Sequence, residues 1–304
     1  MKLIASDHTK VVYYDTETGD SKVLHSGQGV YYGITWDDLD NLYLAVSNSL
    51  KLLHLNDASK QVTGVIEKST SEGKKTSSPF MSSPHQIFWK HGLLYVADTG
   101  RNRLTMVSET DLENEGEVKV TEADWDKVNN VQTGVHVNSV YITANSKYLY
   151  MLAHGADNPS FYQKYDYERL KLLEEKELKA NWAHNIALID GKLLICNSKG
   201  SSLIDGISNK VLWKPKDDDS LTRGLCVTDD RIYVGRSPRA SRADRTKFRG
   251  SSGGFWTLDR KTYKELDYTP IPNLTHINEM RVLDLLDYAH NGIIFNSENV
   301  YGDN

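Results

Sequence analysis

Short apolar runs recur along the chain, and polar turns separate them. A typical unit is an apolar run, a turn with Asp or Gly, a second apolar run that ends in small polar residues, and then a third strand. The runs are rich in β-branched and aromatic residues, and they do not follow the 3.6-residue period of an amphipathic helix. The pattern therefore predicts β-strands joined by tight turns.

The unit repeats about every 40 to 50 residues, which is the spacing of β-propeller blades. We place the first strand of each blade at residues 33–37, 85–89, 138–143, 184–190, 223–229 and 278–284. The last copy has only an ambiguous second strand near residues 292–296, but residues 3–7, 11–15 and 22–25 supply a second, third and fourth strand. Residues 69–83, rich in Ser, Lys and Thr, are expected to connect two blades.

A blade built from both chain ends closes the ring and removes the open edges that would otherwise pair with other chains. A division into two domains would leave an orphan blade at each end. We therefore predict an all-β, six-bladed β-propeller that forms a single domain over residues 1–304.

One stretch carries a family resemblance. Residues 94–104, Leu-Tyr-Val-Ala-Asp-Thr-Gly-Arg-Asn-Arg-Leu, closely resemble an NHL repeat. The weaker copies resemble the wider six-bladed group that contains the gluconolactonase and senescence-marker lineage, the paraoxonases and strictosidine synthase. The resemblance covers the whole chain as architecture and is specific only at this one repeat. A shared fold does not carry a shared function.

Polar side chains are expected to converge at one end of the central channel, where first strands of such propellers begin and second strands end. The first strands bring Tyr32, His85, His136, Asn138, His184, Asn185, Arg223, His276, Asn278 and Glu279. The second strands bring Asp7, His8, Asp98, Arg101, His154, Asp157, Asn197, Arg236 and Arg239. The remaining histidines, His25, His54, His91 and His290, are expected in turns or outer strands. The sequence thus predicts one shared polar pocket.

Imidazoles from separate blades can bind a transition metal, since neutral His suits Zn, Fe, Cu or Ni. We predict a divalent metal ion of unknown identity, held by His85, His136, His184, His276, Asn138 and Asn278. The gluconolactonase lineage holds its cation with carboxylate and Asn oxygens, so that resemblance implies an oxygen-rich alternative that includes Asn185 and Glu279 and favours Ca or Mg. The competing interpretation is a water-filled channel in which each His bonds a backbone carbonyl.

An arginine-rich stretch over residues 236–249 is predicted to lie above the pocket. Its five arginines are Arg236, Arg239, Arg242, Arg245 and Arg249. Guanidinium groups bind carboxylate or phosphate, so this loop would clamp or admit an anionic substrate, or else is a solvated surface loop. With 41 acidic against 36 basic residues, the chain does not favour nucleic acid as a partner.

Composition adds a prediction about the compartment. The first apolar residues give way to Asp7, so there is no signal-peptide core, and no apolar run reaches the roughly 18 residues of a membrane span. Cys196 and Cys226 lie in apolar runs and are expected to be buried thiols. These features predict a cytoplasmic protein without membrane contact, and they do not indicate an oligomeric state.

No nucleophile-elbow, zinc-protease, phosphate-loop or dinucleotide motif is present. We predict a metal-dependent enzyme of the hydrolase, lactonase or lyase kind that acts on a small, anionic substrate. His136, His184, His276 and Glu279 would be catalytic, and Tyr32, Arg223, Arg236, Arg239, His154 and Asn185 would bind substrate. The alternative is a non-catalytic propeller that recognises a saccharide, peptide or protein, with Trp36, Trp89, Trp182 and Tyr32 available for stacking.

Overall fold

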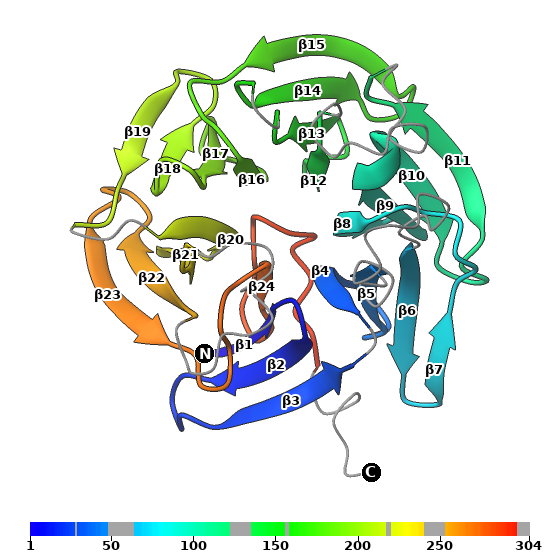
Figure 1. Cartoon of the computed structure of the whole chain (residues 1–304), viewed down its shortest axis with the longest axis horizontal. Helices are drawn as coiled ribbons and strands as arrows, with labels where there is room; N and C mark the ends of the chain where they lie inside the picture. Colours follow the sequence, from blue (N-terminus) through cyan, green and yellow to red (C-terminus); the bar gives the residue numbers. More distant parts are fainter. Residues whose placement is uncertain are drawn as a thin grey trace, which may run out of the picture.

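The computed structural model describes residues 1–27, 29–47, 64–121, 135–155, 158–216, 220–239 and 253–296. Within these residues, the strands form six four-stranded antiparallel sheets arranged around a central axis (Figure 1). The predicted all-β, six-bladed propeller is therefore confirmed. None of the helices in the described part is long and apolar enough to cross a bilayer.

The closing blade joins both ends of the chain, as predicted. Its strands, in order from the channel outward, are β24 (Glu279–Val282), β1 (Lys2–Ser6), β2 (Lys10–Asp15) and β3 (Ser21–Ser26). Strand β1 pairs antiparallel with β24, with Leu3 opposite Val282 and Ser6 opposite Glu279. This pairing closes the ring by hydrogen bonds between residues that lie far apart in the sequence.

The next two blades follow in chain order. Blade two contains β4 (Val30–Trp36), β5 (Leu42–Ser47), β6 (Gly64–Thr70) and β7 (Gly73–Thr76). Blade three contains β8 (Pro84–Lys90), β9 (Leu93–Asp98), β10 (Arg103–Ser108) and β11 (Asn114–Lys119), with the short 3-10 helix η2 (Thr99–Arg101) after β9.

The last three blades complete the ring. Blade four contains β12 (Val137–Ile142), β13 (Tyr148–Ala153), β14 (Phe161–Asp166) and β15 (Lys171–Glu177). Blade five contains β16 (Ala183–Ile189), β17 (Lys192–Asn197), β18 (Ser202–Asp205) and β19 (Lys210–Trp213). Blade six contains β20 (Leu221–Val227), β21 (Arg231–Ser237), β22 (Gly254–Asp259) and β23 (Glu265–Pro270).

Burial falls from the innermost strand of each blade to the outermost strand. Strands β5, β12 and β20 are buried along their whole length, whereas β7 is exposed throughout. Inner strands pack on both faces and so are apolar nearly without interruption, while outer strands face water and carry Lys and Glu. Apolar packing between neighbouring blades, with Trp36, Tyr43 and Phe88 fully buried, makes up the core.

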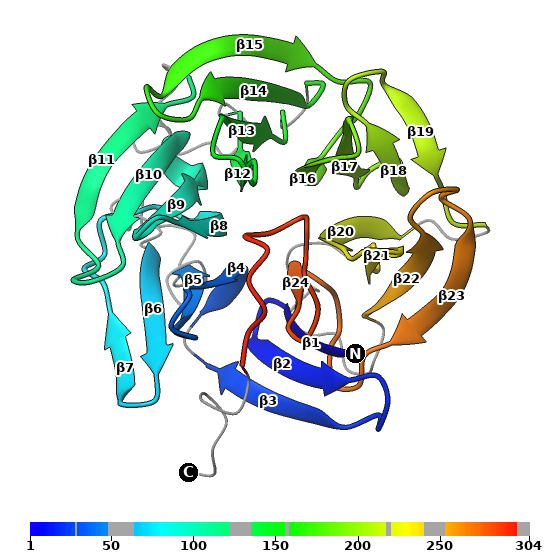
Figure 2. The ribbon, with the colours of Figure 1, turned by 180° about the vertical axis from the view of Figure 1, so that it is seen from behind.

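The chain after β24 runs across the far end of the channel, and we call residues 283–296 the strap (Figure 2). The Tyr288 amide donates to the Val227 carbonyl of blade six, and the Asn291 side chain donates to the Trp36 carbonyl of blade two. The Trp36 indole in turn donates to the Ile293 carbonyl at 2.9 Å. These contacts tie the strap to the ends of first strands, opposite the end where those strands begin.

The strap bears on two sequence predictions. His290 lies in a turn, as predicted, but this turn belongs to the strap: the imidazole is buried and stacks on Trp36 and Phe88, with ring centroids 4.9 and 5.4 Å apart. The ambiguous second strand near residues 292–296 is part of the strap and forms no strand. The expected connector over residues 69–83 is also wrong in part, because it contains the end of β6 and all of β7. The sequence pattern missed these cases because the strap and β7 lack apolar alternation.

Replacing His290 with Phe is expected to reduce acid destabilisation. Burial, aided by Arg281, holds the pKa of His290 well below its usual value. Below a pH of about 6.5 the unfolded chain therefore takes up a proton that the folded chain refuses, and the free energy of unfolding falls. Phe keeps the stacking and has no group that the unfolded chain could protonate. The decrease in the free energy of unfolding between pH 6.5 and pH 5 should therefore be smaller in the variant, by up to about 2 kcal/mol.

Urea unfolding at both pH values measures this difference. The same substitution at the exposed turn residue His91 is the control for replacing an imidazole by a phenyl ring. An identical pH dependence in wild type and His290→Phe would show that His290 is not held neutral by the fold.

Candidate functional site

The first strand of five blades carries a β-bulge at its polar start. The register shifts between Tyr31 and Gly33, Pro84 and Ile87, Val137 and Ser139, His184 and Ile186, and Thr222 and Leu225. A bulge frees one or two residues from the ladder and turns their side chains. The polar side chains at these positions therefore do not follow the alternation of the rest of the strand.

Close packing at the bulges depends on glycine. A Cβ at Gly33 would lie 2.3 Å from the His85 carbonyl oxygen, and one at Gly235 would lie 2.0 Å from the Arg223 carbonyl oxygen. Any larger residue would push these backbones apart. The two glycines therefore set how closely the strands that carry His85 and Arg223 approach their neighbours.

Side chains from all six blades meet in a ring at this end of the channel. We call this set the rim ring: His8, Tyr32, His85, His136, His154, Trp182, His184, Arg223, His276 and Asn278. Tyr32 stacks on His85 with centroids 4.0 Å apart, and His85 contacts His136 at 5.0 Å. His136 contacts His154 at 4.6 Å within blade four, and His154 in turn contacts Trp182 and His184 of blade five.

Arg223 and Asn278 complete the ring between blades five and one. The Arg223 guanidinium donates to Nε2 of His184, and its Nη1 donates to the Asn278 amide oxygen at 3.2 Å. Asn278 Nδ2 donates to the Tyr31 carbonyl at 2.9 Å. His8 and His276 bond to each other beside Asn278.

Solvent reaches part of the ring. Tyr32, His136, His154 and Trp182 are partly exposed, whereas His85, His184 and Arg223 are buried below them. The ring therefore has a solvent-facing upper part and a buried lower part with a fixed hydrogen-bond pattern.

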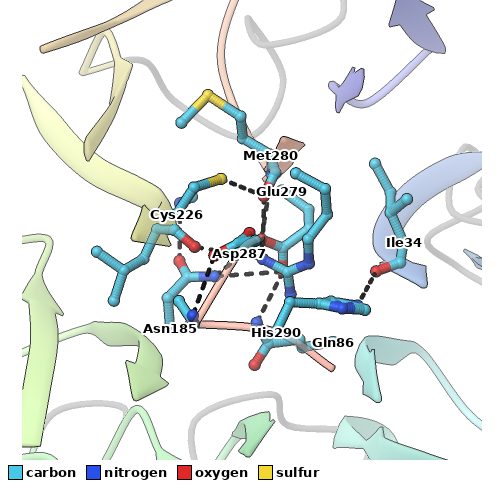
Figure 3. A network of polar contacts seen from close by, with 12 residues as sticks. Ile34, Gln86, Asn185, Cys226, Glu279, Met280, Asp287 and His290 are labelled. Atoms are coloured by element: carbon cyan, nitrogen blue, oxygen red, sulfur yellow. Dashed lines mark hydrogen bonds and ion pairs between the residues drawn. The ribbon is translucent and has the colours of Figure 1, made fainter. Parts of the chain in front are cut away.

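Glu279 lies deeper than the rim ring, in a network that joins three blades (Figure 3). Gln86 Nε2 and Asn185 Nδ2 each donate to the Glu279 carboxylate at 3.0 Å, and Arg281 Nη1 pairs with it at 2.9 Å. Burial raises the pKa of Glu279, and Arg281 acts in the opposite direction. The carboxylate is 1% exposed, so it has no contact with solvent through which a substrate would reach it.

His184 is held in one tautomer. Its Nδ1 lies 2.7 Å from the Trp182 carbonyl oxygen, which can only accept, so Nδ1 carries the hydrogen. Burial, with further contributions from Arg223 and the neighbouring histidines, holds the pKa of His184 well below its usual value. At neutral pH the imidazole is therefore uncharged, and Nε2 accepts from Arg223.

Four of the six predicted metal ligands already accept hydrogen bonds within the protein. The Asn138 amide oxygen accepts from Ser139, the Asn278 oxygen accepts from Arg223, and Nε2 of His184 accepts from the same guanidinium. His276 Nε2 accepts from the His8 amide at 3.2 Å. Among the residues that the structure describes, no group of three or more His, Cys, Asp or Glu side chains is arranged to hold a metal ion.

Four predicted site residues have partners outside the ring. Asn138 donates to the Ala183 carbonyl, and Asn185 belongs to the Glu279 network. Arg236 lies over the Tyr268 ring within its own blade, and Arg239 donates to the Lys199 carbonyl. Arg242, Arg245, Arg249, Asp157 and His54 fall outside the described residues.

Two further residues hold the Glu279 carboxylate in place. Gln86 and Arg281 bind Glu279, but neither was predicted. A usable signal was present: adjacent polar residues begin the otherwise apolar first strands, as in His85-Gln86 and His184-Asn185. Two consecutive polar residues break the period-2 alternation of a strand. Such a break indicates a bulge at which both side chains point towards the channel, at different depths.

No family model and no curated protein matches the sequence. Among solved structures, the chain is similar to one in the crystal structure of a nidogen/laminin complex, with a TM-score of 0.64 and 12% identity over 92% of this chain and 97% of that one. It is also similar to a putative 6-phosphogluconolactonase from Bacteroides fragilis, with a TM-score of 0.56 and 14% identity over 88% of this chain and 81% of that one. These similarities support the propeller fold. The narrower resemblance to the NHL and gluconolactonase groups stays a prediction.

Glu279→Gln is expected to destabilise the fold by about 3 to 5 kcal/mol, because it removes the carboxylate with which the buried Arg281 pairs directly. Urea unfolding monitored by tryptophan fluorescence measures the loss. Glu17→Gln is the control, since Glu17 pairs with the N-terminal amine at an exposed position and should change stability by less than about 1 kcal/mol. Equal stability of Glu279→Gln and wild type would remove the structural role assigned to this network.

Proposed function

We propose that the rim ring binds a small anionic molecule. The observation that carries the proposal is the placement of the Arg223 guanidinium in a ring of imidazole and amide groups that contains no Asp or Glu among its ten members. A guanidinium offers a planar fork of donors that suits carboxylate or phosphate. The ring therefore has a cation to receive an anion, and none of its ten members is a carboxylate.

The charges below the ring support this assignment. The Glu279 carboxylate is paired directly with Arg281, so it does not cancel the charge of Arg223. Burial strengthens the attraction between Arg223 and an incoming anion, because water screens the pair less. A net charge of −5 for the whole chain is compatible with a local positive site.

Aromatic side chains flank the ring on opposite sides. Tyr32 belongs to blade two and Trp182 to blade five, three blades apart around the circle. Each is partly exposed and is backed by an imidazole, with Tyr32 on His85 and Trp182 on His154. Such surfaces add apolar contact for the carbon skeleton of a ligand.

The metal-dependent enzyme, the recognition propeller and the cytoplasmic location remain predictions. One similar structure carries the name of a lactonase and the other is part of a laminin complex, and at these identities neither name transfers beyond the fold. Anion binding by Arg223 is compatible with both an enzyme and a binding protein.

Arg223→Gln is expected to weaken binding of a small anion by about 10-fold to 100-fold, because hydrogen bonds to a charged group contribute about 1.5 to 3 kcal/mol. Isothermal titration calorimetry with inorganic phosphate and with a series of carboxylates measures this change. Arg231→Gln is the matched control, since Arg231 pairs with Asp230 in a turn at the other end of the channel. If wild type binds none of these anions, the proposal is wrong.

Chelation tests the metal prediction separately. We expect protein treated with EDTA to bind the anion as tightly as untreated protein, because Arg223 and the imidazoles make the contacts. Elemental analysis before and after chelation shows whether metal was removed. If chelation removes a stoichiometric metal and abolishes binding, the metal belongs to the site; His136→Ala and His184→Ala should then lose it too.

A further inference from the structure

The lower part of the rim ring contains a built hydrogen-bond chain around His184. Its Nδ1–H is shared between the Trp182 carbonyl at 2.7 Å and the Ser198 hydroxyl at 2.9 Å. Ser198 Oγ donates its own hydrogen to the Thr222 carbonyl at 2.6 Å, so it can only accept from the imidazole. Two acceptors thus hold the hydrogen on Nδ1, and Nε2 keeps its lone pair.

The same construction occurs in blade three. His85 Nδ1 lies 2.8 Å from the Ser83 carbonyl oxygen and 2.7 Å from the Thr99 hydroxyl, which donates to the Val137 carbonyl of the next blade. In both blades the residue two positions before the histidine has a positive φ, 50° at Ser83 and 56° at Trp182. This left-handed backbone aims the carbonyl at Nδ1, and its recurrence shows that the tautomer is set by the blade itself.

Arg223 occupies the Nε2 lone pair of His184 in this structure. A carboxylate that takes the Arg223 N–H now donated to Nε2 leaves His184, which is 8% exposed, without that donor. A buried acceptor that loses its donor costs free energy, because no water takes the donor's place. A ligand avoids that cost if it brings a hydroxyl next to its anionic group, because the hydroxyl then donates to Nε2.

We propose that the rim ring selects 2-hydroxycarboxylates: Arg223 binds the carboxylate, and Nε2 of His184 accepts the hydrogen bond of the hydroxyl on the adjacent carbon. The inference rests on the proposed binding of small anions and adds the chemical class of the ligand. Selectivity arises because a carboxylate without this hydroxyl leaves His184 unpaired. Ser198 and the Trp182 carbonyl act as positioning groups, since they act through the imidazole.

Three ligands of equal charge test the inference: glutarate, 3-hydroxyglutarate and 2-hydroxyglutarate. Calorimetry with the full chain should give about 10-fold tighter binding for 2-hydroxyglutarate than for the other two, as expected for one hydrogen bond to a buried acceptor. The 3-hydroxy isomer has the same formula and places the hydroxyl one carbon too far. Equal affinities for all three ligands would overturn the inference and leave anion binding intact.

Variants locate the effect. His184→Leu should bind all three ligands with the same affinity, because it offers no acceptor, and Ser198→Ala should reduce the preference by about threefold while keeping the imidazole. His91→Leu, in an exposed turn, is the control and should keep the full preference. Thermal unfolding of each variant checks folding, and Ser198→Ala together with the isomer comparison decides the matter if His184→Leu does not fold.

Two results distinguish a failure of the proposed selectivity from a failure of the proposed anion binding. A preference for 2-hydroxyglutarate that survives in His184→Leu would overturn the role of His184. If wild type binds none of the four ligands (glutarate, 2-hydroxyglutarate, 3-hydroxyglutarate and phosphate), the proposed anion binding is wrong, and so is the selectivity that rests on it.

Discussion

The pairing of β1 with β24 is the constraint on which the rest of the structure depends. Its hydrogen bonds join the two ends of the chain and put Ser6 opposite Glu279 and Ile4 opposite Arg281. Without it, the closing blade would lose its innermost strand and the ring would have two open edges. Because β24 carries Glu279 and leads into the strap, ring closure also positions the centre and the far end of the channel.

The channel has three levels with different chemistry. Imidazoles, Arg223 and Asn278 form the rim ring, the paired Glu279 and Arg281 lie below it, and the strap crosses the far end. The middle level resembles other buried ion pairs, which hold elements together when every group is bonded and cost stability when one partner is removed.

The bulges explain how one strand serves two levels. At His184-Asn185, for example, the bulge sends the imidazole to the rim ring and the amide to Glu279. A regular strand would point these neighbours to opposite faces of the sheet. The same device, combined with carbonyls aimed by left-handed residues, fixes the imidazole tautomer and so decides which ring atoms face a ligand.

The sequence by itself determined the blade repeat, the closing blade made from both ends and the approach of His85, His136, His184 and His276, because each depends on local strand patterns and on where first strands begin. Tertiary structure alone decided the depth of Glu279, the contact of Arg236 with Tyr268 and the burial of His290 in the strap. It also showed that the oxygens of Asn138 and Asn278 already accept hydrogen bonds within the protein. These outcomes depend on the distances between blades and on which donor lies within hydrogen-bonding distance of each acceptor. Neither can be read from the spacing of residues along the chain.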